Sequence, residues 1–210
     1  MVDKDDRPIK RDLKMNCASC KSVDCREGKD CTGNADRYLK TYENEPVCRL
    51  HRAASAIEAR HYLKAPRLQE VIFLAKEINV RKVGLAFCIG LSEEARLVEK
   101  ILSQDFEVVS VCCKICGVAK ERFDLEKIHP ENENEVMCNP AGQAEILNEA
   151  GTGLNIICGL CVGHDAVFCM ASKAPVTTLI AKDRVLAHNP VGAIYSQYIR
   201  NRFFPSSDNT

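Results

Sequence analysis

The sequence predicts a three-layer α/β fold of the doubly wound, Rossmann-like type, with a mostly parallel sheet of about four to five strands. Two observations predict the sheet: short apolar runs alternate with amphipathic stretches, and glycine-containing turns follow several of those runs. A third predicts an appendage, because the segment from residue 17 to 48 is polar and opens with four closely spaced cysteines. We therefore expect a cysteine-rich metal-binding module at residues 1–51 and an α/β domain at residues 52–210.

The composition fits a folded protein with no general attraction to polyanions. The 210 residues are 46% hydrophobic, which supports a substantial core. Lys and Arg together number 29, as do Asp and Glu, so no net field draws the chain to nucleic acid or to an anionic membrane. The expected partner is a small molecule or a metal ion, and a homo-oligomer stays open.

The use of cysteine favours a reducing compartment. The chain has 13 cysteines, an odd number in a protein longer than most disulfide scaffolds. The first seven residues are charged and lack the apolar segment of a secretory signal. The apolar stretch from Val83 to Leu91 is too short to span a bilayer. We expect a cytoplasmic protein whose cysteines are ligands, reactive thiols or small core residues.

The first cysteine cluster has the spacing of a metal site. Its four members are Cys17, Cys20, Cys25 and Cys31. Four thiolates satisfy tetrahedral zinc and also an iron–sulfur cluster, and zinc is favoured because the segment looks structural. Cys48 or His51 is an alternative to one of these four ligands. A bound metal supplies the folding free energy that a polar segment cannot obtain by packing.

The remainder of the chain alternates predicted helices and strands. Strands are expected over residues 82–88, 106–112, 154–158 and 177–181. Helices are expected over residues 53–64, 66–78, 92–102, 141–150 and 164–172, and after Pro190. The first strand–helix–strand unit has the length of a crossover, which places its two strands parallel.

Most of the remaining cysteines fall at the ends of these predicted strands. They are Cys88, Cys112, Cys113, Cys116, Cys158 and Cys161, while Cys138 precedes a predicted helix. The functional crevice of an open α/β sheet lies beyond the carboxyl ends of its strands. We expect a second cofactor or metal site there, on Cys113, Cys116, Cys138 and Cys161, with Cys88 as an alternative to Cys113.

The second site has several chemical interpretations. One is a 4Fe-4S cluster or another metal centre for redox or sulfur chemistry on a small molecule, and an iron left open by three thiolates is accessible to substrate. A second is a non-catalytic carrier or sensor of a metal or metalloid. A third is dithiol redox chemistry on Cys158 and Cys161. Cys88 and Cys169, which follow Ala-Phe and Val-Phe, also fit simple core packing.

Polar residues beside the second site are candidates for catalysis. Cys161 is followed by His164 and Asp165 at a predicted helix start. His164 is a candidate second-shell donor or proton carrier, and Asp165 either participates or caps the helix. The segment Lys182-Asp183-Arg184 follows the last predicted strand and is either an anion-binding segment or a solvated turn.

Several motifs together resemble the DUF1847 family of uncharacterised prokaryotic proteins. They are Cys17-x2-Cys20, Gly84-Leu-Ala-Phe-Cys88, Cys112-Cys113-Lys114-x-Cys116-Gly117, Met137-Cys138-Asn139-Pro140, Gly159-Leu-Cys161-Val-Gly-His164-Asp165, and Ala174-Pro-Val-Thr-Thr followed by Lys182-Asp183-Arg184. The resemblance extends over nearly the whole chain. It implies metal binding in a microbial, anaerobic setting, and it supplies no established reaction.

Overall fold

The computed structural model describes residues 15–205, so the charged segment Met1–Arg7 lies outside the described residues. The chain divides between Cys48 and Arg49 into two compact units. The first holds three short 3-10 helices, Cys17–Ser19, Asp24–Glu27 and Lys40–Glu43, and helix α1 (Ala35–Leu39). None of residues 15–48 is buried.

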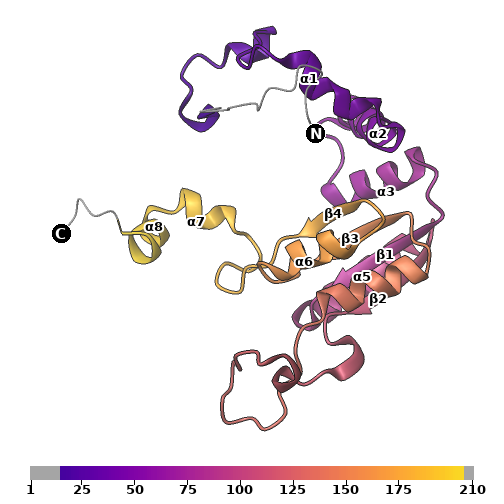
Figure 1. Cartoon of the computed structure of the whole chain (residues 1–210), viewed down its shortest axis with the longest axis vertical. Helices are drawn as coiled ribbons and strands as arrows, with labels where there is room; N and C mark the ends of the chain where they lie inside the picture. Colours follow the sequence, from indigo (N-terminus) through magenta and orange to yellow (C-terminus); the bar gives the residue numbers. More distant parts are fainter. Residues whose placement is uncertain (1–14, 206–210) are drawn as a thin grey trace, which may run out of the picture. The chain divides into compact units, whose positions relative to one another are not determined.

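The second unit confirms the predicted α/β fold with an all-parallel sheet (Figure 1). Its strands lie in the order β2-β1-β3-β4. Their bounds are β1 (Lys82–Phe87), β2 (Glu107–Cys112), β3 (Leu154–Cys158) and β4 (Val176–Ile180), each within a residue of the expected positions. The most deeply buried strand residues include Val83, Leu85, Ile156 and Ile157.

Helices cover both faces of this sheet, and further helices lie elsewhere in the chain. From residue 45 on, the helices are α2 (Glu45–His61), α3 (Arg67–Glu77), α4 (Ser92–Leu102), α5 (Pro140–Glu149), α6 (His164–Ala171), α7 (Val191–Tyr195) and α8 (Gln197–Phe203). The crossovers through α4 and α5 run in opposite directions across the sheet, and right-handed crossovers therefore place these helices on opposite faces. Helices α5 and α6 lie side by side in front of the sheet (Figure 1).

Three helix boundaries differ from the sequence-based expectation. Helix α2 begins at Glu45 rather than at residue 53, so Cys48 and His51 lie on a helix. Leu91 rather than Ser92 is the N-cap of α4. The C-terminal region forms two helices instead of one, because Ser196 is extended and its hydroxyl caps α8 by accepting a hydrogen bond from the Ile199 amide.

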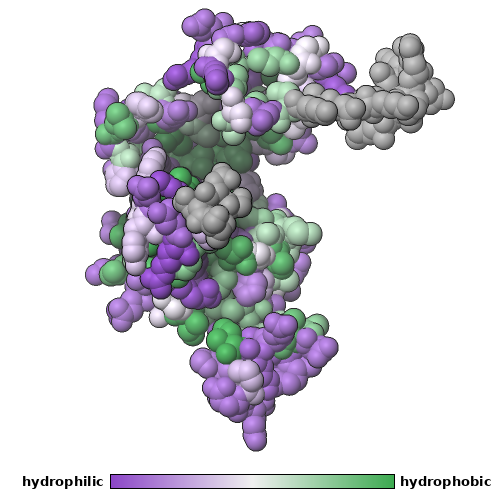
Figure 2. Space-filling view, turned by 90° about the vertical axis from the view of Figure 1, so that its left-hand side faces the viewer, coloured by the Kyte–Doolittle hydropathy of each residue, from purple (hydrophilic) through white to green (hydrophobic). Residues whose placement is uncertain are grey.

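The C-terminal helices leave aromatic side chains on the surface. Phe203 and Phe204 are 46% and 67% exposed, and Tyr195 and Tyr198 are also exposed. On the face shown in Figure 2, hydrophilic and hydrophobic side chains both reach the surface. No helix among residues 15–205 is long and apolar enough to cross a membrane.

The connection between β2 and α5 is a long loop that is closed at its base. The Met137 amide donates to the Val118 carbonyl at 2.8 Å, and the Lys120 amide donates to the Glu135 carbonyl at 2.9 Å. The side chains of Lys120 and Glu135 form an ion pair of 2.7 Å in which each is only 13% exposed. This ion pair lowers the pKa of Glu135 to about 2. The two ends of the loop, residues 118–120 and 135–137, are therefore held side by side.

Replacing Glu135 by Gln is expected to loosen this closure. Hydrogen exchange at the Lys120 and Met137 amides should accelerate several-fold, because the charge-assisted contact that holds the two segments together is weakened. NMR or mass spectrometry measures the exchange. In the control variant Glu131→Gln, which alters an exposed contact with His129, the exchange rates should stay unchanged.

Candidate functional site

Backbone hydrogen bonds beyond the strands bring the cysteines of neighbouring strands together. The Cys113 amide donates to the Phe87 carbonyl at 2.8 Å, and the Cys88 amide donates to the Cys158 carbonyl at 3.3 Å. The parallel ladder thus continues past β1, so that Cys88 lies between the chain segments of Cys113 and Cys158.

The start of α5 places Cys138 beside Cys113. The Asn139 amide donates to the Cys113 carbonyl at 2.8 Å. Asn139 is also the N-cap of α5, since its side-chain oxygen accepts a hydrogen bond of 2.9 Å from the Gly142 amide, and Pro140 occupies the first helical turn. The helix cap therefore fixes the position of a cysteine 25 residues distant from Cys113 in the sequence.

Gln143 forms hydrogen bonds with the backbone at the same edge of the sheet. Its side-chain amide donates to the Val111 carbonyl at 2.6 Å and to the Phe87 carbonyl at 3.2 Å. Phe87 directly precedes Cys88, and Val111 lies two residues before Cys113. Gln143 is fully buried, and its side-chain oxygen has no hydrogen-bond partner among the described residues.

Three thiols form a row in which Cys113 is central. Hydrogen bonding with Cys113 lowers the pKa of Cys88 to about 4 and that of Cys138 to about 5. The pKa of Cys113 is raised, since its hydrogen bonds to Cys138 and Cys88 require its proton and burial disfavours its charge. The Sγ atom of Cys113 also accepts a hydrogen bond of 3.4 Å from the Ile89 amide. Cys113 has a single S–H proton, which Cys88 and Cys138 compete to accept.

Cationic side chains surround these thiols. Lys182 Nζ donates to Cys88 Sγ at 2.8 Å, and Arg184 Nη2 donates to Cys161 Sγ at 2.9 Å. Lys114 and His164 also lower the pKa of Cys138 by their charge. Because cations favour ionised sulfur, this environment is typical of functional rather than purely structural cysteines.

The surroundings of the Cys158-x-x-Cys161 pair raise the pKa values of both thiols instead of lowering them. Cys158 is fully buried, and this burial together with the nearby Glu94 and Cys88 raises its pKa to about 11. Burial also raises the pKa of Cys161, and the charge of Cys88 adds to the effect. Because the attacking group in dithiol exchange is a thiolate, these shifts disfavour that use of the pair.

The structure brings together some of the expected site residues and leaves others apart. Cys113 and Cys138 share a hydrogen bond. Two further residues lie nearby: the charge of His164 lowers the pKa of Cys138, and the charge of Cys138 contributes to raising the pKa of Cys161. Cys116 is exposed in a turn with φ of 68°, and no hydrogen bond joins its thiol to the other cysteines within residues 15–205. The Asp165 carboxylate accepts a hydrogen bond of 2.8 Å from the Ala166 amide at the start of α6.

Of the two cysteines expected to pack in the core, only one requires correction. Cys88 is 6% exposed and belongs to the buried core, and it also receives the Lys182 ammonium and belongs to the thiol row. The sequence feature that predicts this role is the position of Cys88 directly after a buried strand. Cys169 is exposed, because the buried face of α6 is the one that carries Phe168.

The N-terminal cysteines lie on the surface of the first unit. Cys17, Cys20, Cys25 and Cys31 are exposed and unpaired by disulfides. Hydrogen bonds from the Val23 backbone and the Ser22 side chain lower the pKa of Cys20. Across residues 15–205, no group of three or more His, Cys, Asp or Glu side chains is arranged so that it holds a metal ion.

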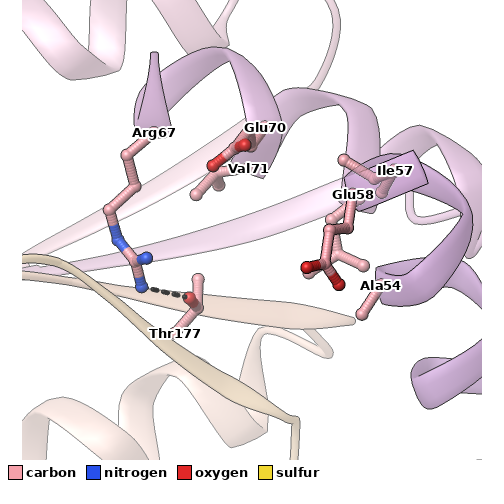
Figure 3. A pocket seen from close by; sticks show the side chains of 8 residues that line it. Ala54, Ile57, Glu58, Arg67, Glu70, Val71 and Thr177 are labelled. Carbon is pink, nitrogen blue, oxygen red and sulfur yellow. Dashed lines mark hydrogen bonds between the residues drawn. The ribbon is translucent and has the colours of Figure 1, made fainter. Parts of the chain in front are cut away.

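A separate cavity of about 290 Å³ lies beside the amino end of β4 (Figure 3). Ile57, Val71 and Leu74 give it apolar walls, and Glu58 and Glu70 supply carboxylates. Arg67 Nε donates to the Thr178 carbonyl at 2.7 Å, and its Nη2 donates to Thr177 Oγ1 at 3.4 Å. Arg67 thereby occupies the outer edge of the sheet, at the end opposite to the cysteines.

Comparisons with known proteins agree with the motifs in the sequence. A family model described as a protein of unknown function (DUF1847) matches residues 25–179. The uncharacterized protein MJ0455 of Methanocaldococcus jannaschii is 51% identical over 185 residues, which cover 88% of this chain and 95% of that protein. No solved structure matches the chain. The chain belongs to the DUF1847 family.

Proposed function

We propose that the α/β unit binds a thiophilic metal ion or an iron–sulfur cluster through Cys88, Cys113 and Cys138, whose side chains would have to turn toward one another because they are not arranged to hold a metal in this structure. The observation that carries this proposal is the meeting of three thiols from three chain segments at one edge of the sheet, where Cys113 hydrogen bonds with both Cys88 and Cys138. Thiolate sulfur is the donor that zinc, copper(I) and iron–sulfur clusters prefer. When bound, such a centre supplies either structural cross-linking or redox and Lewis-acid chemistry.

The surroundings of the thiols support metal binding in two ways. Lys182 already stabilises the ionised form of Cys88, which is the form that a metal requires. The cations Lys182, Lys114 and Arg184 offset the negative charge of a sulfur-rich centre. Cys88, Cys113 and Cys138 would hold such a metal as thiolates, so Cys113 would have to give up its proton to solvent.

We also infer that Cys17, Cys20, Cys25 and Cys31 hold a second, structural metal, either zinc or an iron–sulfur cluster. Their spacing supports this inference. A second argument is that residues 15–48 contain no buried side chain, so that hydrophobic packing contributes little to their order. A metal that cross-links four thiolates supplies the missing folding free energy.

Anaerobic purification followed by metal and sulfide analysis tests the proposal. The variant Cys113→Ser should lose about one equivalent of metal or cluster per chain, because it removes the central ligand of the row. The matched control Cys116→Ser should retain the full content, since Cys116 lies outside the row. Equal metal content in wild type and Cys113→Ser would contradict the proposal. Sulfide and the visible spectrum distinguish a cluster from zinc.

A further inference from the structure

The cavity beside β4 is formed by one side of each of two helices. Ala54 and Glu58 line it four residues apart on α2, and Glu70 and Leu74 line it four residues apart on α3. This spacing places each pair on one side of its helix. All the lining residues belong to the second unit. Each helix therefore supplies one carboxylate and one apolar side chain to the same cavity.

The cavity has a buried apolar wall. Ile57 and Val71, from the same two helices, are only 6% and 4% exposed. The rings of His61 and Phe73 stack with their centroids 4.2 Å apart and so join α2 to α3. The volume of about 290 Å³ is at the small end of the range of ligand sites. The space therefore suits a small molecule with an apolar part.

The two carboxylates in this cavity lack a cationic partner. Arg67 is turned toward the sheet, where it donates to the Thr178 carbonyl and to Thr177 Oγ1. Within residues 15–205, no ion pair or hydrogen bond joins Glu58 or Glu70 to another group. Figure 3 shows the Glu58 carboxylate on the side of the cavity opposite to Arg67. The cavity therefore carries a net negative charge beside its apolar wall.

We propose that this cavity binds a small organic ammonium ion. Its N–H groups donate charge-assisted hydrogen bonds to Glu58 and Glu70, and its apolar body packs against Ile57, Val71 and Leu74. A neutral apolar molecule leaves two carboxylates without partners, and an anion is repelled by them. A hard metal ion requires six or more oxygen ligands, which these walls do not supply. The proposal is independent of the metal proposed for the cysteines.

NMR titration of the ¹⁵N-labelled full chain with hexylammonium tests this proposal. The amide signals of lining residues such as Ala54, Val71 and Thr177 should shift and saturate. The same apolar chain without the positive charge, as 1-hexanol or hexanoate, should bind about tenfold more weakly or less. This comparison separates recognition of the charge from simple burial of the chain.

Three variants locate the ligand within the cavity. Glu58→Gln and Glu70→Gln should each weaken hexylammonium binding about tenfold, because each removes one charged acceptor. Ala54→Leu should also weaken it, since a larger side chain at this exposed helical position fills the cavity without disturbing the core. The matched control is Glu145→Gln, an exposed carboxylate on α5 outside the cavity, which should leave the affinity unchanged.

Several results would overturn the proposal. One is the absence of saturable shifts at the lining residues. A second is equal affinity for hexylammonium and 1-hexanol, which makes the site merely apolar, and a third is tighter binding of hexanoate, which makes Arg67 the recognition group. Full affinity in both Glu58→Gln and Glu70→Gln, or in Ala54→Leu, places the ligand elsewhere. Unchanged signals outside the cavity in each variant verify that it is folded.

Discussion

In the metal-free protein, iodoacetamide is expected to alkylate Cys138 at pH 6 nearly as fast as at pH 8. An ordinary thiol such as glutathione reacts roughly a hundredfold more slowly at the lower pH, because the thiolate is the nucleophile and its fraction falls with pH. Hydrogen bonding with Cys113, aided by Lys114 and His164, lowers the pKa of Cys138 to about 5. Its thiolate therefore persists until the pH falls toward 5. Mass spectrometry of the Cys138 peptide measures the rate.

The variant Cys113→Ala should restore a steep pH dependence at Cys138. It removes the largest cause of the lowered pKa, so the rate should fall between pH 8 and pH 6 as it does for an ordinary thiol. Cys116→Ala provides the matched comparison and should behave like wild type. A steep profile in wild type, or a flat one in Cys113→Ala, would show that the thiols do not share a proton in this way.

Replacing Gly84 by Ala is expected to destabilise the protein by about 3 kcal/mol, with a correspondingly lower denaturant midpoint. A Cβ atom at Gly84 meets Asn155 Oδ1 at 2.1 Å and Leu147 Cδ1 at 2.7 Å. Neither group has room to move, since both residues are fully buried. Asn155 also receives a hydrogen bond of 2.7 Å from Thr152 and donates one of 2.9 Å to Ser172, and these bonds are lost if it shifts.

Three further variants, Gly90→Ala, Asn155→Ala and the double variant of Gly84 and Asn155, identify the cause of this loss. Gly90→Ala should leave the stability almost unchanged, because its Cβ meets only the flexible end of Lys182 at 3.1 Å. Asn155→Ala combined with Gly84→Ala should cost less than the sum of the two single changes, since the clash and the network involve the same side chain. Additive losses in the double variant would place the strain elsewhere. Urea denaturation measures all four proteins.

The sequence predicts the central strands β1 and β3 well because they are buried on both faces, whereas the edge strands β2 and β4 are partly exposed. A fully buried strand reads as a continuous apolar run, as residues 83–87 show. The meeting of Cys88 and Cys113 follows from the parallel order of β1 and β2, since parallel strands end at one edge, whereas Cys138 is placed by the start of α5. Cys169 was misassigned because residues adjacent on a helix point about 100° apart, so burial of Phe168 turns Cys169 outward.

The loops limit what the sequence predicts about the site. Cys116 and Cys161 both lie in glycine-containing turns, and local pattern does not distinguish them. The positive φ of Cys116 separates it from the row. Likewise, the contacts of Lys182 and Arg184 depend on the path of the chain after β4, which is set by backbone hydrogen bonds to the Asp183 carboxylate and not by hydrophobic periodicity. Long-range contacts of this kind have no local signal.

The closed base of the loop between Cys113 and Cys138 has an evolutionary consequence. Because Lys120 and Glu135 hold the two ends together, the intervening segment is anchored independently of its own length. Insertions or deletions between these two residues are therefore expected to leave the distance in space between Cys113 and Cys138 unchanged. This segment is a place where new recognition elements could be added beside the site without disturbing the thiol row.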